Sequence, residues 1–181
     1  MSRIGRLPIP IDGVEVKIAD DQVSVKGKRG EDFYPLPEGV TAKIEGAFLH
    51  IARADDSQDQ RRLHGVTRAE VNNRVVGVSK GHAITLIVQG KGYSAEVKPK
   101  ALDMQIGFSH RVVAAIPAGL KIEVKPGQNE FSLTVTGNDK HLVGAFASTL
   151  YKLRKVEPYN LIGFRYSDQQ VKRKAAKSVV T

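Results

Sequence analysis

The sequence contains an internal repeat, and this repeat constrains the fold more than any other feature. The tetrapeptides Pro37-Glu38-Gly39-Val40 and Pro117-Ala118-Gly119-Leu120 lie 80 residues apart. In the residues that follow each of them, apolar side chains alternate with polar ones, which predicts a pair of half-buried strands. The apolar residues are Ala42, Ile44, Phe48, Leu49 and Ile51 in the first copy and Ile122, Val124, Phe131, Leu133 and Val135 in the second.

A helical period follows these strands in both copies. Ser57 and Asp59 supply N-cap acceptors before the first helix, and Gly137-Asn138-Asp139 supplies them before the second. We expect the two helices to be closed by Gly77 and Pro158. Each helix presents one apolar stripe, formed by Leu63, Val66, Val71, Val75 and Val78 in the first copy and by Val143, Phe146, Leu150 and Leu153 in the second.

Further runs of strand type precede each Pro-x-Gly turn. Val14–Ile18 and Val23–Lys26 flank Asp20-Asp21, which is a hairpin signal. We expect Ile84–Val88 and Leu102–Ile106 to take the matching part in the second copy.

Taken together, these patterns predict an α+β fold. It consists of two tandem copies of a small antiparallel sheet with one helix packed on it, plus a basic C-terminal tail. The predicted divisions are an N-terminal α+β repeat at 1–82, a C-terminal α+β repeat at 83–166 and a basic tail at 167–181.

The charge of the chain favours a polyanionic partner. Lys and Arg number 28 against 19 Asp and Glu, a formal net charge of +9. Residues 1–82 carry a net charge of only +1, whereas residues 83–181 carry +8, of which +6 lies within residues 151–181. We therefore expect the C-terminal repeat and the tail to make most contacts with a nucleic acid.

Other classes of protein are disfavoured by composition. The chain has no cysteine, so disulfides and thiolate metal sites are excluded. It has no apolar run of the ~18 residues needed to span a membrane and none that suits a signal peptide. We expect a cytoplasmic protein with no membrane partner, no metal and no cofactor.

Seven ordered motifs give the chain a family resemblance. They are Met-Ser-Arg-Ile-Gly-Arg-Leu-Pro-Ile-Pro at 1–10, Leu-His-Gly-Val-Thr-Arg at 63–68, Asn-Asn at 72–73, Gly-Val-Ser-Lys-Gly at 77–81, Gly-Lys-Gly-Tyr at 90–93, Gly-Phe-Ser-His at 107–110 and Asp-Lys-His-Leu-Val-Gly at 139–144. In this order and spacing they resemble the bacterial-type L-six family of large-subunit ribosomal proteins, from residue 1 to about Tyr166.

The resemblance implies a structural protein without enzymatic activity. It implies binding to large-subunit (23S-type) rRNA close to the sarcin–ricin loop and the stalk base. Neighbouring ribosomal proteins at the stalk base, and transient proximity to translation factors, would follow from that position.

Three departures from the family pattern affect the RNA-contacting segments. Arg111 stands where the family usually has proline, and Asn160-Leu161-Ile162 replaces a segment that usually contains two lysines. The last residues, Ser178 to Thr181, are not a lysine run.

The candidate RNA-binding residues combine cations with aromatic side chains. Cations neutralise phosphates, and aromatic rings stack on exposed bases. The alternative for the tail is a solvated helix terminus followed by disordered chain. The candidates are Lys91, Tyr93, Ser109, His110, Arg111, Lys140, Arg154, Lys155, Tyr159, Arg165, Tyr166, Lys172, Arg173, Lys174 and Lys177.

Two glycine-containing segments of the second repeat have alternative interpretations. Gly90–Tyr93 permits close approach to a sugar–phosphate backbone, but the residues alone favour a β-bulge or tight hairpin. Gly107–Arg111 is expected at the tip of a hairpin, where it faces either RNA or water, with Phe108 in the core.

Lys140, at the start of the second helix, is a further candidate for phosphate contact, although capping accounts for its neighbours.

The predicted first helix contains a glycine in its interior. This residue, Gly65, indicates close packing against the sheet or against rRNA, of which the helix–sheet contact is favoured. We expect His64, Thr67 and Arg68 to line one exposed face.

Two other functions compete with rRNA binding. Asp55, Asp56 and Asp59 form an acidic cluster that fits a Mg²⁺-dependent nuclease, although capping of the first helix explains these residues more simply. The five histidines are isolated and lack metal-ligand spacing. A basic interaction module outside the ribosome is the third possibility.

Overall fold

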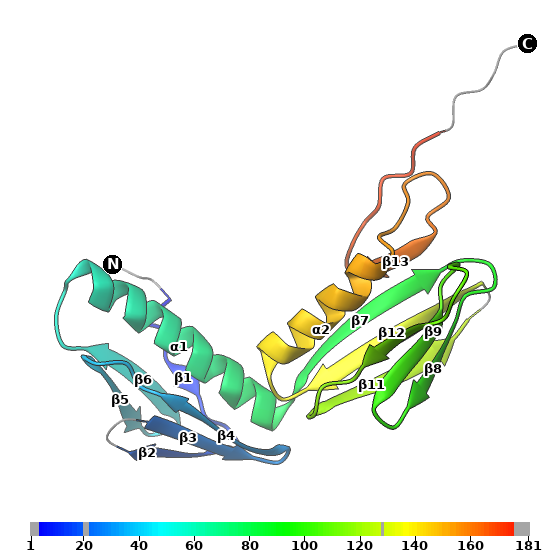
Figure 1. The fold of residues 1–181 in the computed structure, drawn as a ribbon. Helices are drawn as coiled ribbons and strands as arrows, with labels where there is room; N and C mark the ends of the chain where they lie inside the picture. The colour runs from blue at the N-terminus through cyan, green and yellow to red at the C-terminus, as the bar shows by residue number, and fades with distance from the viewer. Residues whose placement is uncertain (1–3, 20–21, 128, 176–181) are drawn as a thin grey trace, which may run out of the picture. The chain divides into compact units, whose positions relative to one another are not determined.

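The computed structural model describes residues 4–19, 22–127 and 129–175 (Figure 1). The chain divides into two compact units. The N-terminal unit comprises Met1–His82 together with Asn138–Lys140, and the C-terminal unit comprises Ala83–Gly137 and His141–Thr181.

The N-terminal unit consists of two three-stranded sheets and one long helix. One sheet has the order β1-β6-β5 and the other β2-β3-β4. Helix α1 packs against β3, β4, β5 and β6, so the core lies between the helix and the two sheets. The elements are β1 (Ile9–Pro10), β2 (Glu15–Ala19), β3 (Gln22–Gly27), β4 (Gly30–Pro35), β5 (Val40–Glu45), β6 (Phe48–Arg53) and α1 (Gln58–Ser79).

The C-terminal unit repeats this plan and adds one strand. Its sheets have the orders β11-β12-β7-β13 and β10-β9-β8. Among the residues described, β13 has no counterpart in the N-terminal unit. The elements are β7 (His82–Gln89), β8 (Ser94–Lys98), β9 (Ala101–Gln105), β10 (Val112–Ala115), β11 (Leu120–Pro126), β12 (Glu130–Gly137), α2 (Lys140–Leu153) and β13 (Gly163–Tyr166).

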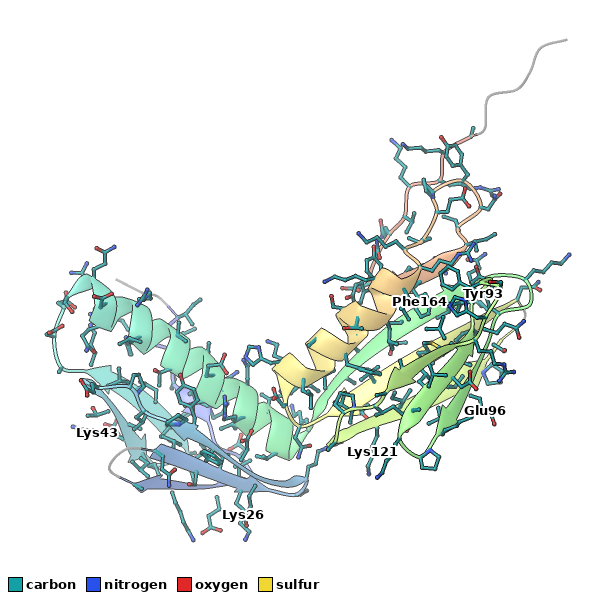
Figure 2. The ribbon with its side chains drawn as sticks, viewed as in Figure 1. Lys26, Lys43, Tyr93, Glu96, Lys121 and Phe164 are labelled. Atoms are coloured by element: carbon teal, nitrogen blue, oxygen red, sulfur yellow. The ribbon has the colours of Figure 1, made fainter. Side chains whose placement is uncertain are left out.

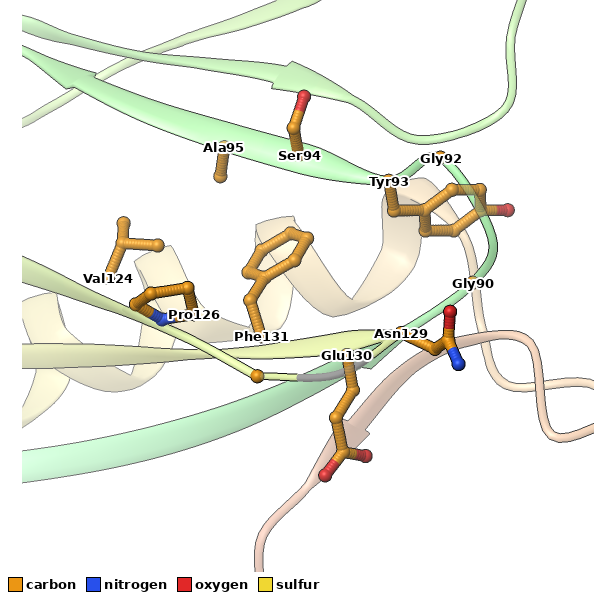
Figure 3. A pocket seen from close by; sticks show the side chains of 11 residues that line it. Gly90, Gly92, Tyr93, Ser94, Ala95, Val124, Pro126, Asn129, Glu130 and Phe131 are labelled. Carbon is orange, nitrogen blue, oxygen red and sulfur yellow. The ribbon is translucent and has the colours of Figure 1, made fainter.

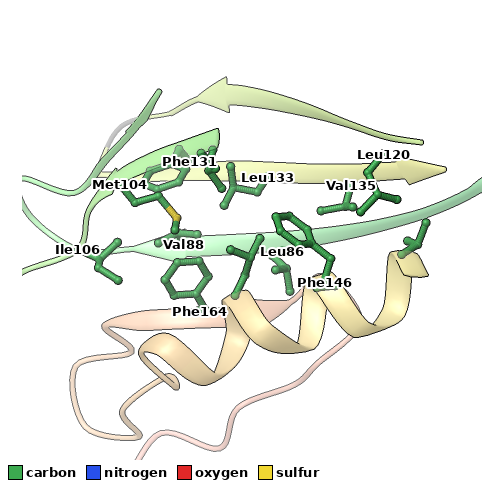
Figure 4. Close-up of a cluster of buried hydrophobic side chains, with 14 residues drawn as sticks. Leu86, Val88, Met104, Ile106, Leu120, Phe131, Leu133, Val135, Phe146 and Phe164 are labelled. Atoms are coloured by element: carbon green, nitrogen blue, oxygen red, sulfur yellow. The ribbon is translucent and has the colours of Figure 1, made fainter. Parts of the chain in front are cut away.

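The core of the C-terminal unit follows from the alternation in β12. Phe131, Leu133 and Val135 point inward, whereas the residues between them are more exposed. The apolar stripe of α2 covers them, with Val143, Phe146 and Leu150 buried (Figure 4). Burial of each such side chain stabilises the fold by about 1.5–3 kcal/mol before the entropic cost of ordering the chain.

The predicted α+β fold with two copies of one plan is confirmed, and the hairpin predicted around Asp20-Asp21 is present as the antiparallel pair β2–β3. The expected match for that hairpin was wrong. Ile84–Val88 lies in β7 and Leu102–Ile106 overlaps β9, and these strands belong to different sheets. The partner of β9 in the matching hairpin is β8. Strand period alone does not specify which strands pair.

Helix α1 differs from expectation in two respects. It runs past the buried Gly77 to Ser79, because that glycine lies on the packed face rather than closing the helix. Its apolar stripe is also displaced: Val66 is 50% exposed, whereas His64 and Thr67 are buried. His64 tolerates burial because both ring nitrogens have partners, the Ile51 carbonyl at 2.8 Å and the Arg53 guanidinium at 3.1 Å.

The expected N-cap of α1 is confirmed. The Ser57 hydroxyl accepts a hydrogen bond from the Gln60 backbone N–H at 3.3 Å. Helix α2 ends at Leu153, before Pro158. No helix within the described residues combines the length and apolar character that crossing a bilayer requires.

Candidate nucleic-acid interface

Three segments that are distant in sequence meet in the C-terminal unit. They are the loop Gly90–Tyr93 after β7, the turn Gly107–Arg111 between β9 and β10, and Arg154 directly after α2. The contacts between them are made by the side chains of Tyr93, Phe108 and Arg154. We call this arrangement the three-segment cluster. Tyr93 packs against the core cluster that contains Phe164, and both side chains are labelled in Figure 2.

The loop Gly90–Tyr93 is neither a hairpin nor a bulge within one sheet, because β7 and β8 belong to different sheets. Its glycines make room for the Tyr93 ring. A Cβ on Gly90 would lie 2.6 Å from Cε2 of this ring, and a Cβ on Gly107 would lie 2.9 Å from its Cε1. The ring therefore occupies space that two missing side chains leave open. The loop, Tyr93 included, also lines a shallow pocket with Val124, Phe131 and Glu130 (Figure 3).

Arg154 holds the cluster together. Its Nη1 donates a hydrogen bond to the Ile106 carbonyl at 2.8 Å. Its guanidinium carbon lies 5.5 Å from the Tyr93 ring centroid and 5.6 Å from that of Phe108, which is cation–π geometry. Arg154 thus connects α2 to both loops, and it is partly buried.

Phe108 was expected in the core, and this was wrong. Its side chain is 42% exposed. Instead of entering the core, its ring stacks with that of His110, with centroids 5.8 Å apart and planes inclined by 10°. Ser109, between them, is exposed. The turn Gly107–Arg111 therefore presents two aromatic rings to its surroundings.

Arg111 is fixed by a carboxylate that the sequence patterns did not single out. Asp103 is only 5% exposed, and its Oδ2 accepts from Lys98 Nζ at 2.8 Å and from Arg111 Nη1 at 3.1 Å. The hydrogen bond from Lys98, with that from Arg111, lowers the pKa of Asp103 below its ordinary value. The same bond raises the pKa of Lys98. A carboxylate between the apolar residues Leu102 and Met104 was the available signal for this contact.

Strand β13 connects the tail to the core. Phe164 is fully buried, and its N–H donates to the Arg154 carbonyl at 2.8 Å. Arg165 lies 3.7 Å from Glu130, and Tyr166 stacks on Tyr151 with centroids 5.1 Å apart. Both predicted RNA-binding residues of β13 are partly buried and already have protein partners.

The described part of the tail folds back along the segment after α2. Arg173 Nε donates to the Tyr159 carbonyl at 3.0 Å, and the Lys174 N–H donates to the Pro158 carbonyl at 3.0 Å. The side chains of Lys172, Arg173, Lys174 and Tyr159 remain exposed. Lys177 lies outside the described residues.

The remaining candidates are Lys91, Lys155 and Lys140, and all three are exposed. Lys91 belongs to the loop of the three-segment cluster, and Lys155 directly follows Arg154. Lys140 is separate: it groups with the N-terminal unit, where its Nζ donates to Asn73 Oδ1 at 3.3 Å.

The carboxylates of the acidic cluster near α1 form hydrogen bonds and ion pairs with neighbouring residues. Asp55 Oδ1 accepts from the Ser57 N–H at 2.9 Å, and hydrogen bonds from Ser57 lower the pKa of Asp55. Asp56 pairs with Arg53 and Arg61, and the hydrogen bond from Arg53 is the main cause that lowers its pKa. Within the described residues, no group of three or more acidic or histidine side chains is arranged to hold a metal ion.

Comparison with known proteins decides the family. The model of the family described as ribosomal protein L6 matches residues 9–81 and again 89–167, one match for each copy of the repeat. The chain belongs to the ribosomal protein L6 family. A large ribosomal subunit protein uL6 from Acidothermus cellulolyticus is 43% identical over 180 residues, covering 98% of this chain and 99% of the relative. The uL6 protein of Bifidobacterium adolescentis is 42% identical over 178 residues, covering 98% of each.

Membership of the L6 family settles the general class of function. The chain is a structural ribosomal protein of the large subunit and not an enzyme, which confirms the prediction from the ordered motifs. It binds rRNA and resides in the cytoplasmic ribosome, as is general for the family. The nuclease hypothesis for Asp55, Asp56 and Asp59 is thereby excluded.

Proposed function

We propose that the chain binds 23S-type rRNA near the sarcin–ricin loop and the stalk base, in the region where translation factors dock. The C-terminal unit and the tail make most of the RNA contacts. Neighbouring large-subunit proteins at the stalk base, and transiently bound factors, are the other partners. The N-terminal unit, whose sequence is close to neutral, faces these proteins more than it faces RNA.

The observation that carries this proposal is the three-segment cluster. It places Arg154 and two aromatic rings beside exposed cations, Lys91 and Lys155, that have no ion pair among the described contacts. An rRNA fold offers both kinds of partner, phosphates for the cations and unpaired bases for the rings. The exposed tail residues Lys172, Arg173 and Lys174 extend the same positive charge along Tyr159.

The mechanism is positional. Lys and Arg side chains neutralise phosphates from several RNA segments and fix their arrangement, with little readout of base sequence. Arg154 and Arg111 are pre-oriented by hydrogen bonds to Ile106 and Asp103, so less side-chain entropy is lost when they meet RNA.

Salt dependence tests the phosphate contacts. Affinity for protein-free large-subunit rRNA is measured over a range of salt concentrations for the full chain and for a Lys172→Ala, Arg173→Ala, Lys174→Ala triple variant. Each lost contact to a duplex phosphate lowers the slope of log affinity against log salt by about 0.9.

The matched control removes three lysines from the N-terminal unit, Lys17→Ala, Lys26→Ala and Lys43→Ala. Exposed pairs such as Lys17–Glu15 and Lys26–Glu31 contribute little to stability, so this variant stays folded. We expect its salt slope to stay close to that of the parent chain. A flat salt dependence of the parent, or equal losses in both triple variants, contradicts the proposed division of contacts.

The location in the subunit is tested by directed cleavage. The chain has no cysteine, so Ser109→Cys creates a single attachment site for a tethered Fe(II) chelate on the exposed turn. In reconstituted large subunits, hydroxyl radicals from this site should cut the rRNA around the sarcin–ricin loop. A Thr41→Cys variant places the same probe on β5 of the N-terminal unit as a control. Cleavage from Ser109→Cys confined to other rRNA domains refutes the proposed location.

A further inference from the structure

The turn Gly107–Arg111 carries an aromatic surface that the fold leaves partly exposed. Phe108 is 42% exposed although the neighbouring Leu102, Met104 and Ile106 are fully buried. Exposure of an apolar ring to water is unfavourable, so a partner that covers the ring gains free energy. The His110 ring lies nearly parallel to it, with the two ring centroids 5.8 Å apart.

The geometry of this surface is held from the protein side. Gly107 has a φ of +79°, and a Cβ there would lie 2.6 Å from Arg154 Nη1. The guanidinium of Arg154 therefore packs directly against the turn while it contacts the Phe108 ring. At the other end of the turn, Arg111 is tied to the buried Asp103. Both ends are thus fixed, and the rings between them are pre-organised.

We propose that the Phe108–His110 stack is a platform for one unpaired rRNA nucleobase. This inference rests on the proposed function and specifies one contact within it. Nucleobases stack on aromatic side chains irrespective of their identity, because every base has a π-face. The cations at the platform, Arg111 and Arg154, favour a ligand whose base is attached to a phosphate backbone. The carboxylate that pairs with Arg111, Asp103, also accepts a hydrogen bond from Lys98.

The first test separates stacking from electrostatic attraction. We expect Phe108→Leu to lower affinity for protein-free large-subunit rRNA by about 5- to 150-fold, the range that loss of one stacked base produces. Its salt slope should equal that of the parent chain, since no phosphate contact is lost. Phe108→Tyr keeps the ring and should bind within about twofold of the parent. Unchanged affinity of Phe108→Leu overturns the proposal.

The second test observes the stack directly. The chain has no tryptophan, so Phe108→Trp creates a single fluorescent indole on the platform. Stacking of a base on this indole should quench its emission when the rRNA binds. Phe33→Trp is the matched control, because Phe33 is likewise an exposed phenylalanine, 61% accessible, but lies on β4 of the N-terminal unit. Its emission should change little.

The outcomes distinguish this inference from the proposed function. If the Phe108→Trp variant binds rRNA, as a gel-shift assay reports, but its emission is not quenched, the platform is refuted and rRNA binding stands. An emission that responds only to large-subunit proteins also refutes it, since the partner is then a protein. Absence of rRNA binding by the parent chain refutes the proposed function itself. Thermal melts show whether Phe108→Leu, Phe108→Tyr and Phe108→Trp are folded as stably as the parent chain.

Discussion

The fully buried Phe164 links the C-terminal tail to the core, and its truncation has a predictable cost. The ring belongs to the core cluster of the C-terminal unit, which also contains Leu86, Val88 and Leu150. Replacement of a buried phenylalanine by alanine typically costs 3–5 kcal/mol, because transfer energy is lost and a cavity remains. Domains of this size have total stabilities of about 5–15 kcal/mol. Phe164→Ala should therefore remove a large part of the stability of the C-terminal unit.

Thermal and chemical unfolding of the full chain measures this effect. A loss of 3 kcal/mol lowers the midpoint by about 12 °C or more in a domain of roughly a hundred residues. Phe33→Ala removes an exposed ring instead and should change stability by less than about 0.5 kcal/mol. If Phe164→Ala costs less than about 1 kcal/mol, β13 is not an integral strand of the sheet. The assignment of Phe164 as the link between tail and core is then refuted.

Two further predictions concern the tail and the buried carboxylate. Deletion of Lys172 to Thr181 should lower rRNA affinity. The melting midpoint should move by no more than about 2 °C, because the described side chains of this segment are exposed. If the deletion variant is unfolded, the tail is part of the core and the prediction is wrong. Asp103→Asn should destabilise the chain at neutral pH, because the lowered pKa of Asp103 stabilises the fold above the ordinary pKa of about 3.9. That difference should vanish as the pH falls through the lowered pKa, and a difference independent of pH argues against a charge effect.

Much of the fold could be predicted from local patterns in the sequence. The strands and the first helix were predictable because their signals are local: period-two runs before and after Pro37 and Pro117, and the Ser57 cap. The repeat showed that the same order of elements occurs twice. Strand pairing is different, because it joins residues far apart in the chain. Nothing in the local pattern of Ile84–Val88 shows that its neighbours are β12 and β13 rather than β9.

The sequence patterns predicted the wrong burial for two side chains, and each error has a physical reason. His64 reads as polar in a helical pattern, but it is buried because both ring nitrogens are satisfied by Ile51 and Arg53. Phe108 reads as apolar, but the turn that carries it leaves its ring exposed beside His110. Tertiary partners decide the burial of His64, and the local turn decides the exposure of Phe108, so the residue type alone decides neither.

The binding surface was predictable only in part. The distribution of charge predicted the basic tail as an RNA-binding segment, and the family motifs predicted Tyr93, Ser109 and His110 as RNA-binding residues. The convergence of Tyr93, Phe108 and Arg154 depends on three connections of the fold, so no single window of sequence contains it. The residue-level contacts with RNA therefore stay a prediction.

The packing of the Tyr93 ring between Gly90 and Gly107 has a consequence for how the site responds to mutation. Because Arg154 contacts both Tyr93 and the turn that carries Phe108, these residues share neighbours. Free-energy changes of mutations at such positions do not add, and interaction energies of about 0.5–3 kcal/mol are usual. Tyr93, Phe108 and Arg154 should therefore behave as one thermodynamically coupled unit, in which the first substitution removes most of what a second could still remove.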